Sequence, residues 1–296
     1  MFRPPFIIIY ICIAVLITAC GGQRVASDRS SANTTTVTDD IGRTVTIAAP
    51  AERAISLAPS ITEMVFAAGA GDRLVGVTSF CDFPAETSAI AKVGDTQSPN
   101  IESIVALRPQ LVLVSTASQL ESFMNVLEQQ NIAVYVLDVK GLDDVSRGLR
   151  ALGEIFGTKE ESDQKAAEIE RRTNAFTVKP PDPETSKVFL QISAEPLFTI
   201  GADSFLTDLI ARAGGESVTR EVPGGYPKLS KETALAMKPD VIVLSDSEDN
   251  RDPNPVFANS PAVKNGRVYR INADIISRPG PRLVDALEEM SAAIKK

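Results

Sequence analysis

Two stretches of the chain, ESIVALRPQLVLVS at residues 102–115 and ETALAMKPDVIVLS at residues 232–245, share one pattern. In each, a short helical segment runs from a glutamate to a basic residue and a proline, and an apolar run suited to a buried strand follows. A second pair of similar segments, residues 62–69 and 207–214, repeats in the same order. Because both pairs of similar segments occur in the same order in the two halves of the chain, they predict two lobes of similar topology.

Short apolar runs alternate with helical patterns on both sides of these stretches, which is typical of βα units around a mostly parallel sheet. An alternating segment at residues 37–47 predicts a hairpin before the first unit. We expect strands at residues 54–57, 74–78, 111–115, 133–137, 188–192, 241–245 and 267–271. We expect helices near residues 61–68, 100–107, 119–129, 143–156, 204–213, 230–237 and 281–294.

A charged segment without glycine or proline, residues 159–178, lies between the two halves. About 20 residues of helix would be about 30 Å long, which suits a single long rigid helix between two α/β lobes. An ordinary surface helix within one domain is the alternative. A ligand cleft is expected between the lobes, because pockets favour such interfaces and the carboxyl ends of parallel strands. The predicted parts are a signal peptide at 1–19, a tether at 20–36, lobes at 37–157 and 181–296, and a connecting helix at 158–180.

The first 20 residues, MFRPPFIIIYICIAVLITAC, predict a bacterial lipoprotein signal. The apolar run after Arg3 is short for a membrane span, and small residues precede Cys20. Cleavage before Cys20 would leave an acylated first residue, and two or three acyl chains anchor a protein stably. An uncleaved signal anchor is the alternative. We therefore expect a protein of the periplasm or cell surface that is lipid-anchored to a bacterial membrane.

The composition argues against several classes of function. The 296 residues carry a formal charge of −8 without a long basic stretch, so no nucleic-acid partner is expected. The chain has no histidine, which excludes Ser-His-Asp and Cys-His nucleophiles and removes the commonest ligand of transition metals. We therefore expect no metal site of the protein's own. Cys81 has no partner once Cys12 leaves with the signal and Cys20 is acylated, so we expect a small buried side chain rather than a reactive thiol.

Glu102 and Glu232 occupy the first turn of their predicted helices, where the helix dipole favours an acid. This local effect explains one glutamate well, but it explains less well why both lobes carry one at the same offset. The alternative is that the two acids meet basic sites on a membrane partner, where charge pairs fix register and speed encounter. Ser60 and Glu63 predict a capping box at the start of another helix, which gives Glu63 no role toward a ligand.

Aromatic side chains gather on loops that follow predicted strands. Phe80 and Phe83 follow the strand at 74–78, Phe198 follows the strand at 188–192, and Tyr226 lies in a turn-rich loop. Apolar rings on loops suit the wall of a binding site, although each alone could be a local packing anchor.

Asp274, Arg278 and Arg282 flank a Pro-Gly-Pro turn before the last predicted helix. They predict either a clamp for an anionic or amide-rich ligand or a structural Arg–Asp pair. A hydrolase that works through carboxylates would need two acids that converge in the cleft, whereas Glu102 and Glu232 look peripheral. A purely adhesive or structural lipoprotein would need no cleft.

Together these segments resemble the ABC-transporter solute-binding proteins of the ferric-siderophore and cobalamin class, and within it the cobalamin-binding members most closely. The resemblance extends over residues 39–296. It implies two α/β lobes joined by one rigid helix, as in class III periplasmic binding proteins, with the ligand between them and no enzymatic activity. The segments that carry it are RAISLAPSITEMVFAAGAGDRLVGVTSFCDFP, NIESIVALRPQLVLV, LSKETALAMKPDVIVL and SRPGPRLVDALEEM.

The resemblance also implies roles for single residues. Glu102 and Glu232 would dock the permease dimer by pairing with arginines of its subunits. The ligand would be a cobalamin-like corrinoid, or alternatively a ferric siderophore or haem, each of which arrives with its metal already chelated. No further cofactor is implied, and a monomer is expected. The expected ligand contacts are Phe80, Phe83, Phe198, Tyr226, Asp274 and Arg278.

Overall fold

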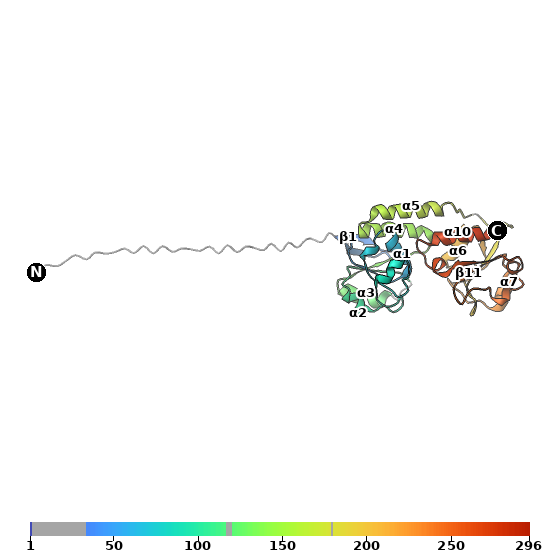
Figure 1. Cartoon of the computed structure of the whole chain (residues 1–296), viewed down its shortest axis with the longest axis horizontal. Coiled ribbons are helices and arrows are strands. Elements are labelled where there is room, and N and C mark those ends of the chain that lie inside the picture. The colour runs from blue at the N-terminus through green and yellow to red at the C-terminus, as the bar shows by residue number, and fades with distance from the viewer. Residues whose placement is uncertain (2–33, 117–119, 179) are drawn as a thin grey trace. The chain divides into compact units, whose positions relative to one another are not determined.

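The structure, a computed structural model, describes Met1 and residues 34–116, 120–178 and 180–296. Residues from Asn33 to Lys296 form one compact unit (Figure 1). Residues 2–19 of the predicted signal peptide and the predicted lipidation site Cys20 lie outside the described residues. No described helix is long and apolar enough to cross a bilayer.

The first lobe is built on a five-stranded parallel sheet in the order β5-β4-β3-β6-β7. Its four predicted strands are confirmed. The interior strand β6 is buried at every position, as expected of a parallel strand that is covered on both faces. Its strands are β3 (Ala54–Ser56), β4 (Leu74–Val77), β5 (Ala91–Lys92), β6 (Leu111–Val114) and β7 (Ala133–Val136). Its helices are α1 (Pro59–Ala67), α2 (Ile101–Ala106), α3 (Leu120–Gln129) and α4 (Leu142–Phe156), with short 3₁₀ turns η1 (Gly71–Arg73) and η2 (Ala85–Ala89).

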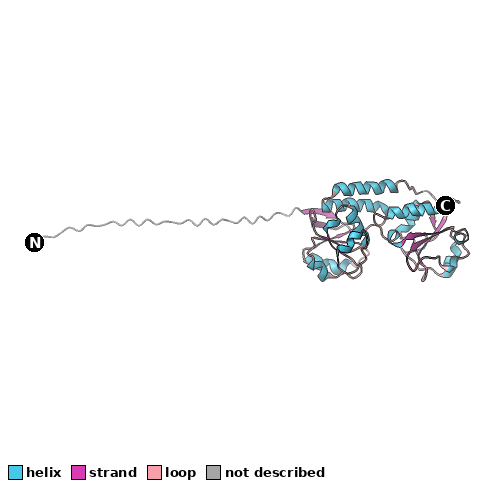
Figure 2. Cartoon of the chain, viewed as in Figure 1, coloured by secondary structure: helices cyan, strands magenta, loops and turns pink. Residues whose placement is uncertain are grey.

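The second lobe carries parallel strands in the order β10-β8-β11-β12, and β9 pairs antiparallel with β8. Two α/β lobes with mostly parallel sheets are therefore confirmed (Figure 2). The strands are β8 (Lys187–Ser193), β9 (Phe198–Thr199), β10 (Glu216–Ser217), β11 (Val241–Asp246) and β12 (Val268–Asn272). The helices are α6 (Phe205–Arg212), α7 (Lys231–Met237), α8 (Pro261–Lys264), α9 (Ala273–Ile276) and α10 (Leu283–Ile294), with the 3₁₀ turn η3 (Pro255–Phe257).

The predicted hairpin is present but begins earlier than residue 37. Strands β1 (Thr34–Thr38) and β2 (Thr44–Ala48) pair in register, so the last three residues assigned to the tether belong to a strand. Asp39 holds the turn, because its carboxylate accepts the Arg43 N–H at 2.8 Å. The Asp40 N–H donates to the Val136 carbonyl at 3.0 Å, which ties the hairpin to β7 at the edge of the sheet.

The connecting helix α5 (Lys159–Thr173) is shorter than the predicted helix over 158–180, at about 22 Å for its 15 residues. The chain turns at Asn174, and Phe176 then packs against the core under the ammonium of Lys295. Helix α5 lies beside α4 (Figure 1), and near its end Arg172 pairs with Asp285 and Glu288 of α10. The helix therefore joins the lobes, but it ends earlier, since the chain turns at Asn174 and the half-buried Phe176 then packs against the core.

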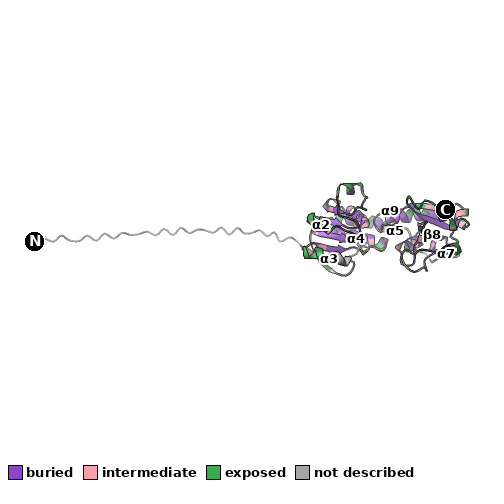
Figure 3. Ribbon diagram, turned by 90° about the horizontal axis from the view of Figure 1, so that it is seen from below, coloured by how far each residue is buried: buried purple, intermediate pink, exposed green. Residues whose placement is uncertain are grey.

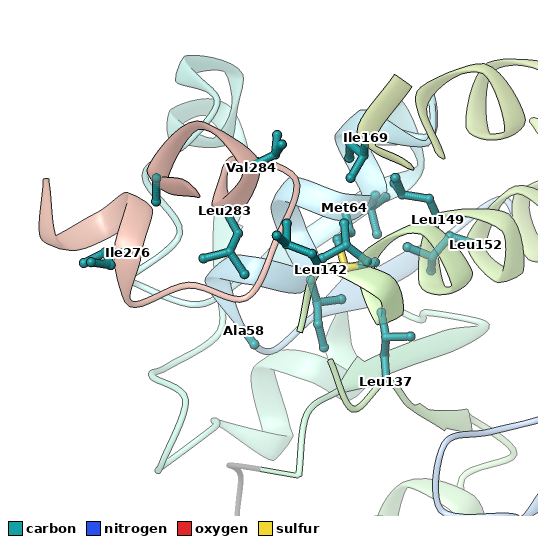
Figure 4. Packing of buried hydrophobic residues seen from close by; sticks show 14 of the residues in the cluster. Ala58, Met64, Leu137, Leu142, Leu149, Leu152, Ile169, Ile276, Leu283 and Val284 are labelled. Atoms are coloured by element: carbon teal, nitrogen blue, oxygen red, sulfur yellow. The ribbon is translucent and has the colours of Figure 1, made fainter. Parts of the chain in front are cut away.

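One hydrophobic cluster includes residues of both lobes. Figure 3 shows the buried residues concentrated in the sheets and in the helices packed on them. Figure 4 shows side chains of α1, α4 and α5 close to those of α9 and α10. A shared close-packed core opposes rotation of one lobe against the other. The labelled members include Met64, Leu149, Leu152, Ile169, Ile276, Leu283 and Val284.

Replacing Gly153 by alanine is expected to destabilise the fold by about 1–3 kcal/mol. A methyl group at Gly153 on α4 would overlap the side chain of Ser162 on α5, where the two helices are in contact. Urea denaturation would measure the free energy of unfolding. The control is Gly141→Ala, because no heavy atom lies within 4 Å of the added carbon there. Equal effects of the two substitutions would contradict the close α4–α5 contact.

Candidate functional site

A cavity of about 470 Å³ opens at the carboxyl ends of the strands in the first sheet. The loops that follow β3, β4, β6 and β7 form most of its wall, and the segment from Asp274 to Pro279 closes it from the second lobe. This volume lies within the range of small-molecule sites. A larger hollow of about 690 Å³ lies along β2 and β7, away from the junction of the lobes. The lining includes Phe80, Thr116, Asp138, Asp274 and Arg278.

Phe80 is the aromatic residue of the cavity wall. The residue is 58% exposed, which is unusual for a phenylalanine and leaves apolar surface open to a bound molecule. Phe83, three residues further on, lies outside this lining, and the guanidinium of Arg282 sits 4.1 Å from the centre of its ring. Phe83 therefore makes a cation–π contact with Arg282. Its contact with ligand stays a prediction.

Phe198 and Tyr226 lie on neighbouring segments of the second lobe and do not line this cavity. The backbone of Thr199 donates to Pro227 at 3.1 Å, so β9 runs beside the loop that holds Tyr226. Burial raises the pKa of Tyr226 above its ordinary value, while a hydrogen bond with Ser204 acts in the opposite direction. The structure thus brings Phe80, Asp274 and Arg278 together, and the rings of Phe83, Phe198 and Tyr226 lie outside the cavity lining.

Glu63 was predicted to cap its helix, and this prediction is wrong. Helix α1 begins at Pro59, so Ser60 already lies inside the helix and cannot serve as its N-cap. The Glu63 side chain is only 2% exposed and accepts hydrogen bonds from Arg282 at 2.8 and 2.6 Å. It also accepts one from Arg278 at 3.3 Å. The residue is therefore part of a buried ion cluster that bridges α1 and the segment before α10.

Arg278 contacts two further carboxylates of this cluster. Its guanidinium donates to Asp82 at 2.6 and 3.3 Å and to Asp274 at 2.7 Å. The hydrogen bond from Arg278 holds the pKa of Asp82 below its ordinary value, against the opposing effect of burial. Burial alone would lower the pKa of Arg278, but its acidic partners raise it. The structural Arg–Asp pair left open by the sequence is therefore present, and contact of Asp274 and Arg278 with ligand stays a prediction.

Sequence reasoning missed Glu63 and Asp82 as members of this cluster. Asp82 stands between the two loop phenylalanines in the quoted FCDFP segment, but nothing local shows that its partner lies 196 residues away. Thr116 and Asp138 were missed as well, and their side chains are joined by a 2.5 Å hydrogen bond at the cavity. Thr116 and Asp138 follow β6 and β7. Their place at the carboxyl ends of parallel strands is the feature of the sequence that could have predicted them as cavity residues.

Glu102 and Glu232 occupy equivalent places in the two lobes. Each is exposed and stands second in its helix, α2 or α7, after a residue that caps the helix with its side chain. Asn100 accepts the Ser103 N–H at 2.9 Å. Backbone and Ser230 hydrogen bonds lower the pKa of Glu232. Figures 1 and 3 show α2 and α7 in different lobes, so the docking role rests on one acid per lobe and stays a prediction.

Cys81 is a small buried side chain, as predicted. It is 2% exposed, and its sulfur lies 3.2 Å from the Thr62 hydroxyl and 3.1 Å from that of Thr78. Across residues 34–116, 120–178 and 180–296, no cluster of three or more histidine, cysteine or acidic side chains is arranged to hold a metal ion.

Comparison with known proteins gives a consistent set of relatives. The family model described as periplasmic binding protein matches residues 55–275. A vitamin B12-binding protein of Vibrio cholerae is 30% identical over 248 residues, which cover 83% of this chain and 90% of that protein. An uncharacterized ABC transporter substrate-binding lipoprotein of Bacillus subtilis is 28% identical and covers 95% of this chain and 93% of its own length. The crystal structure of the Vibrio cholerae periplasmic vitamin B12-binding protein has a TM-score of 0.74 and 30% identity, covering 83% of this chain and 97% of that one.

Proposed function

Because the chain belongs to the periplasmic binding protein family, we propose that it is the substrate-binding component of an ABC importer for a cobalamin-like corrinoid. It would capture the corrinoid between its lobes and deliver it to the permease. The family binds solutes and does not transform them, so the protein is not an enzyme. The observation that carries the proposal is a cavity bounded by both lobes in a chain 30% identical to a vitamin B12-binding protein.

The charges around the cavity favour a corrinoid over an anionic chelate. Arg278 lines the cavity and Arg282 lies outside its lining, and both donate their hydrogen bonds to carboxylates of Glu63, Asp82 or Asp274. Haem and the ferric catecholate siderophores carry anionic oxygens, for which unpaired cationic donors are the strong hydrogen-bond partners. A corrinoid presents peripheral amides and an apolar ring face, and the exposed ring of Phe80 suits such a face.

We extend the proposal to the membrane anchor. The small residues before Cys20 favour acylation of its thiol. The Bacillus subtilis relative, which matches over 95% of this chain, is named a lipoprotein. Acylation would hold the binding protein next to the membrane that contains its permease.

Calorimetric titration of the full chain in detergent with cyanocobalamin, ferric siderophores and haem tests the ligand. We expect cyanocobalamin alone to bind, with a Kd in the micromolar range or below, or about −8 kcal/mol or better. Exclusive binding of a ferric siderophore or haem would replace the corrinoid by that alternative within the same importer class. Absence of binding to all three would overturn the importer proposal in this form.

A further inference from the structure

We propose that Glu63 sets the charge selectivity of the binding site, because it neutralises the two arginines beside the cavity and thereby excludes anionic metal chelates. The inference rests on the proposed function and concerns the class of ligand that the same site accepts. Glu63 is a positioning residue in this role, since it does not line the cavity itself and acts through Arg278 and Arg282.

Both carboxylate oxygens of Glu63 accept hydrogen bonds from guanidinium groups. One carboxylate oxygen accepts Nε of Arg282 at 2.8 Å, and the other accepts Nη2 of Arg282 at 2.6 Å and Nη1 of Arg278 at 3.3 Å. Parallel hydrogen bonds of this kind are the strong form of an arginine–carboxylate contact. At 2% exposure for the carboxylate, the pair is little screened by solvent, so the guanidinium of Arg282 presents almost no free charge.

The acids of the cluster outnumber its bases. Glu63, Asp82 and Asp274 face Arg278 and Arg282, and no other described carboxylate pairs with Arg282. Without Glu63 the count would be two positive and two negative groups, and the charge of Arg282 would be released 4.1 Å from the ring of Phe83. The cluster would then change from a net negative charge to a balanced one, and Arg278, which lines the cavity, would keep only Asp82 and Asp274 as partners.

The remaining charged groups near the cavity do not offset this change. Asp138 lines the cavity and pairs with the largely exposed Lys140 at 3.1 Å. Lys92 donates to the backbone carbonyls of Cys81 and Thr87. Glu63 is therefore the single buried carboxylate of the cluster that decides whether the arginines meet an anionic ligand.

A charge-selectivity role also accounts for a buried ion pair where apolar side chains of similar volume would stabilise the fold as well. Taking a carboxylate and two guanidinium groups out of water costs free energy that their attraction offsets only in part, so a buried pair is weak evidence for stability. Polar groups that repel the wrong ligand are a recognised means of discrimination. The burial of Glu63 between the lobes is explained if rejecting anions is what it contributes.

Titration of the full chain in detergent with cyanocobalamin and with a ferric tricatecholate, an anionic chelate, tests the inference. The variants are Glu63→Gln, Glu63→Asp and Asp82→Asn. We expect Glu63→Gln to bind the anionic chelate at least about tenfold more tightly than the unaltered chain, with affinity that falls as salt rises. Glu63→Asp keeps the charge and should keep the selectivity, and Asp82→Asn should give a smaller gain. The matched control is Glu170→Gln, which removes an arginine-paired carboxylate on α5 and should leave chelate binding unchanged.

The outcomes separate this inference from the proposed function. A folded Glu63→Gln protein without gained affinity for the anionic chelate would overturn the inference even where cyanocobalamin binds. If Glu63→Gln does not fold, Asp82→Asn decides, because it frees Arg278 from an exposed carboxylate. Failure of the unaltered chain to bind cyanocobalamin, together with gained chelate binding in the variants, would remove the corrinoid proposal and leave the inference standing.

Discussion

Replacing Glu102 and Glu232 together by arginine is expected to abolish uptake of the ligand while the affinity for ligand stays unchanged. The two carboxylates are exposed, stand second in equivalent helices and lie outside the cavity. If each meets a basic site on one permease subunit, reversal places like charges opposite each other, which costs several kcal/mol at each site. Two such sites together predict a loss of uptake of about a hundredfold or more.

Uptake by cells that carry the cognate permease measures the first effect, and calorimetric titration measures the second. The control reverses two exposed glutamates away from α2 and α7, Glu184 and Glu289, so that the change in net charge is the same. Uptake should survive this control. Lost ligand binding in the Glu102 and Glu232 variant, or equal loss of uptake in the control, would contradict a docking role.

Replacing Glu63 by alanine is expected to destabilise the protein by about 3–5 kcal/mol, because it leaves two largely buried guanidinium groups without their shared partner. The side chains of Arg278 and Arg282 are only 13% and 19% exposed. The loss should appear in guanidinium chloride denaturation as a lower midpoint with an unchanged slope.

The matched control is Glu288→Ala, which removes the partner of Arg172 at a carboxylate that is 44% exposed. Surface ion pairs contribute about 0–1 kcal/mol, so this loss should be small. Equal losses for the two variants would show that burial of the Glu63 cluster does not govern its energetics.

The repeated helix-strand pattern around Pro109 and Pro239 predicted two α/β lobes correctly, because the signal is local. A parallel strand buried on both faces reads as a continuous apolar run, and β6 and β11 show this directly. The ends of elements were predicted less well. The hairpin begins at Thr34 because its strands pair across to Ala48, and α5 ends at Thr173 because the chain turns there and packs the half-buried Phe176 against the core.

For the site, the pattern of strands was enough to show which loops follow the strand ends, and it placed Phe80 in the cavity wall. The same pattern showed that Glu102 and Glu232 occupy equivalent helix starts. The role of Glu63 came from the packing of the lobes, because its partners lie 215 and 219 residues away in the chain. Hydrophobic period and helix capping are properties of neighbouring residues, whereas a buried ion cluster between lobes exists only once the lobes have packed. For that reason a local capping pattern suggested one role for Glu63, and its burial against two arginines determines another.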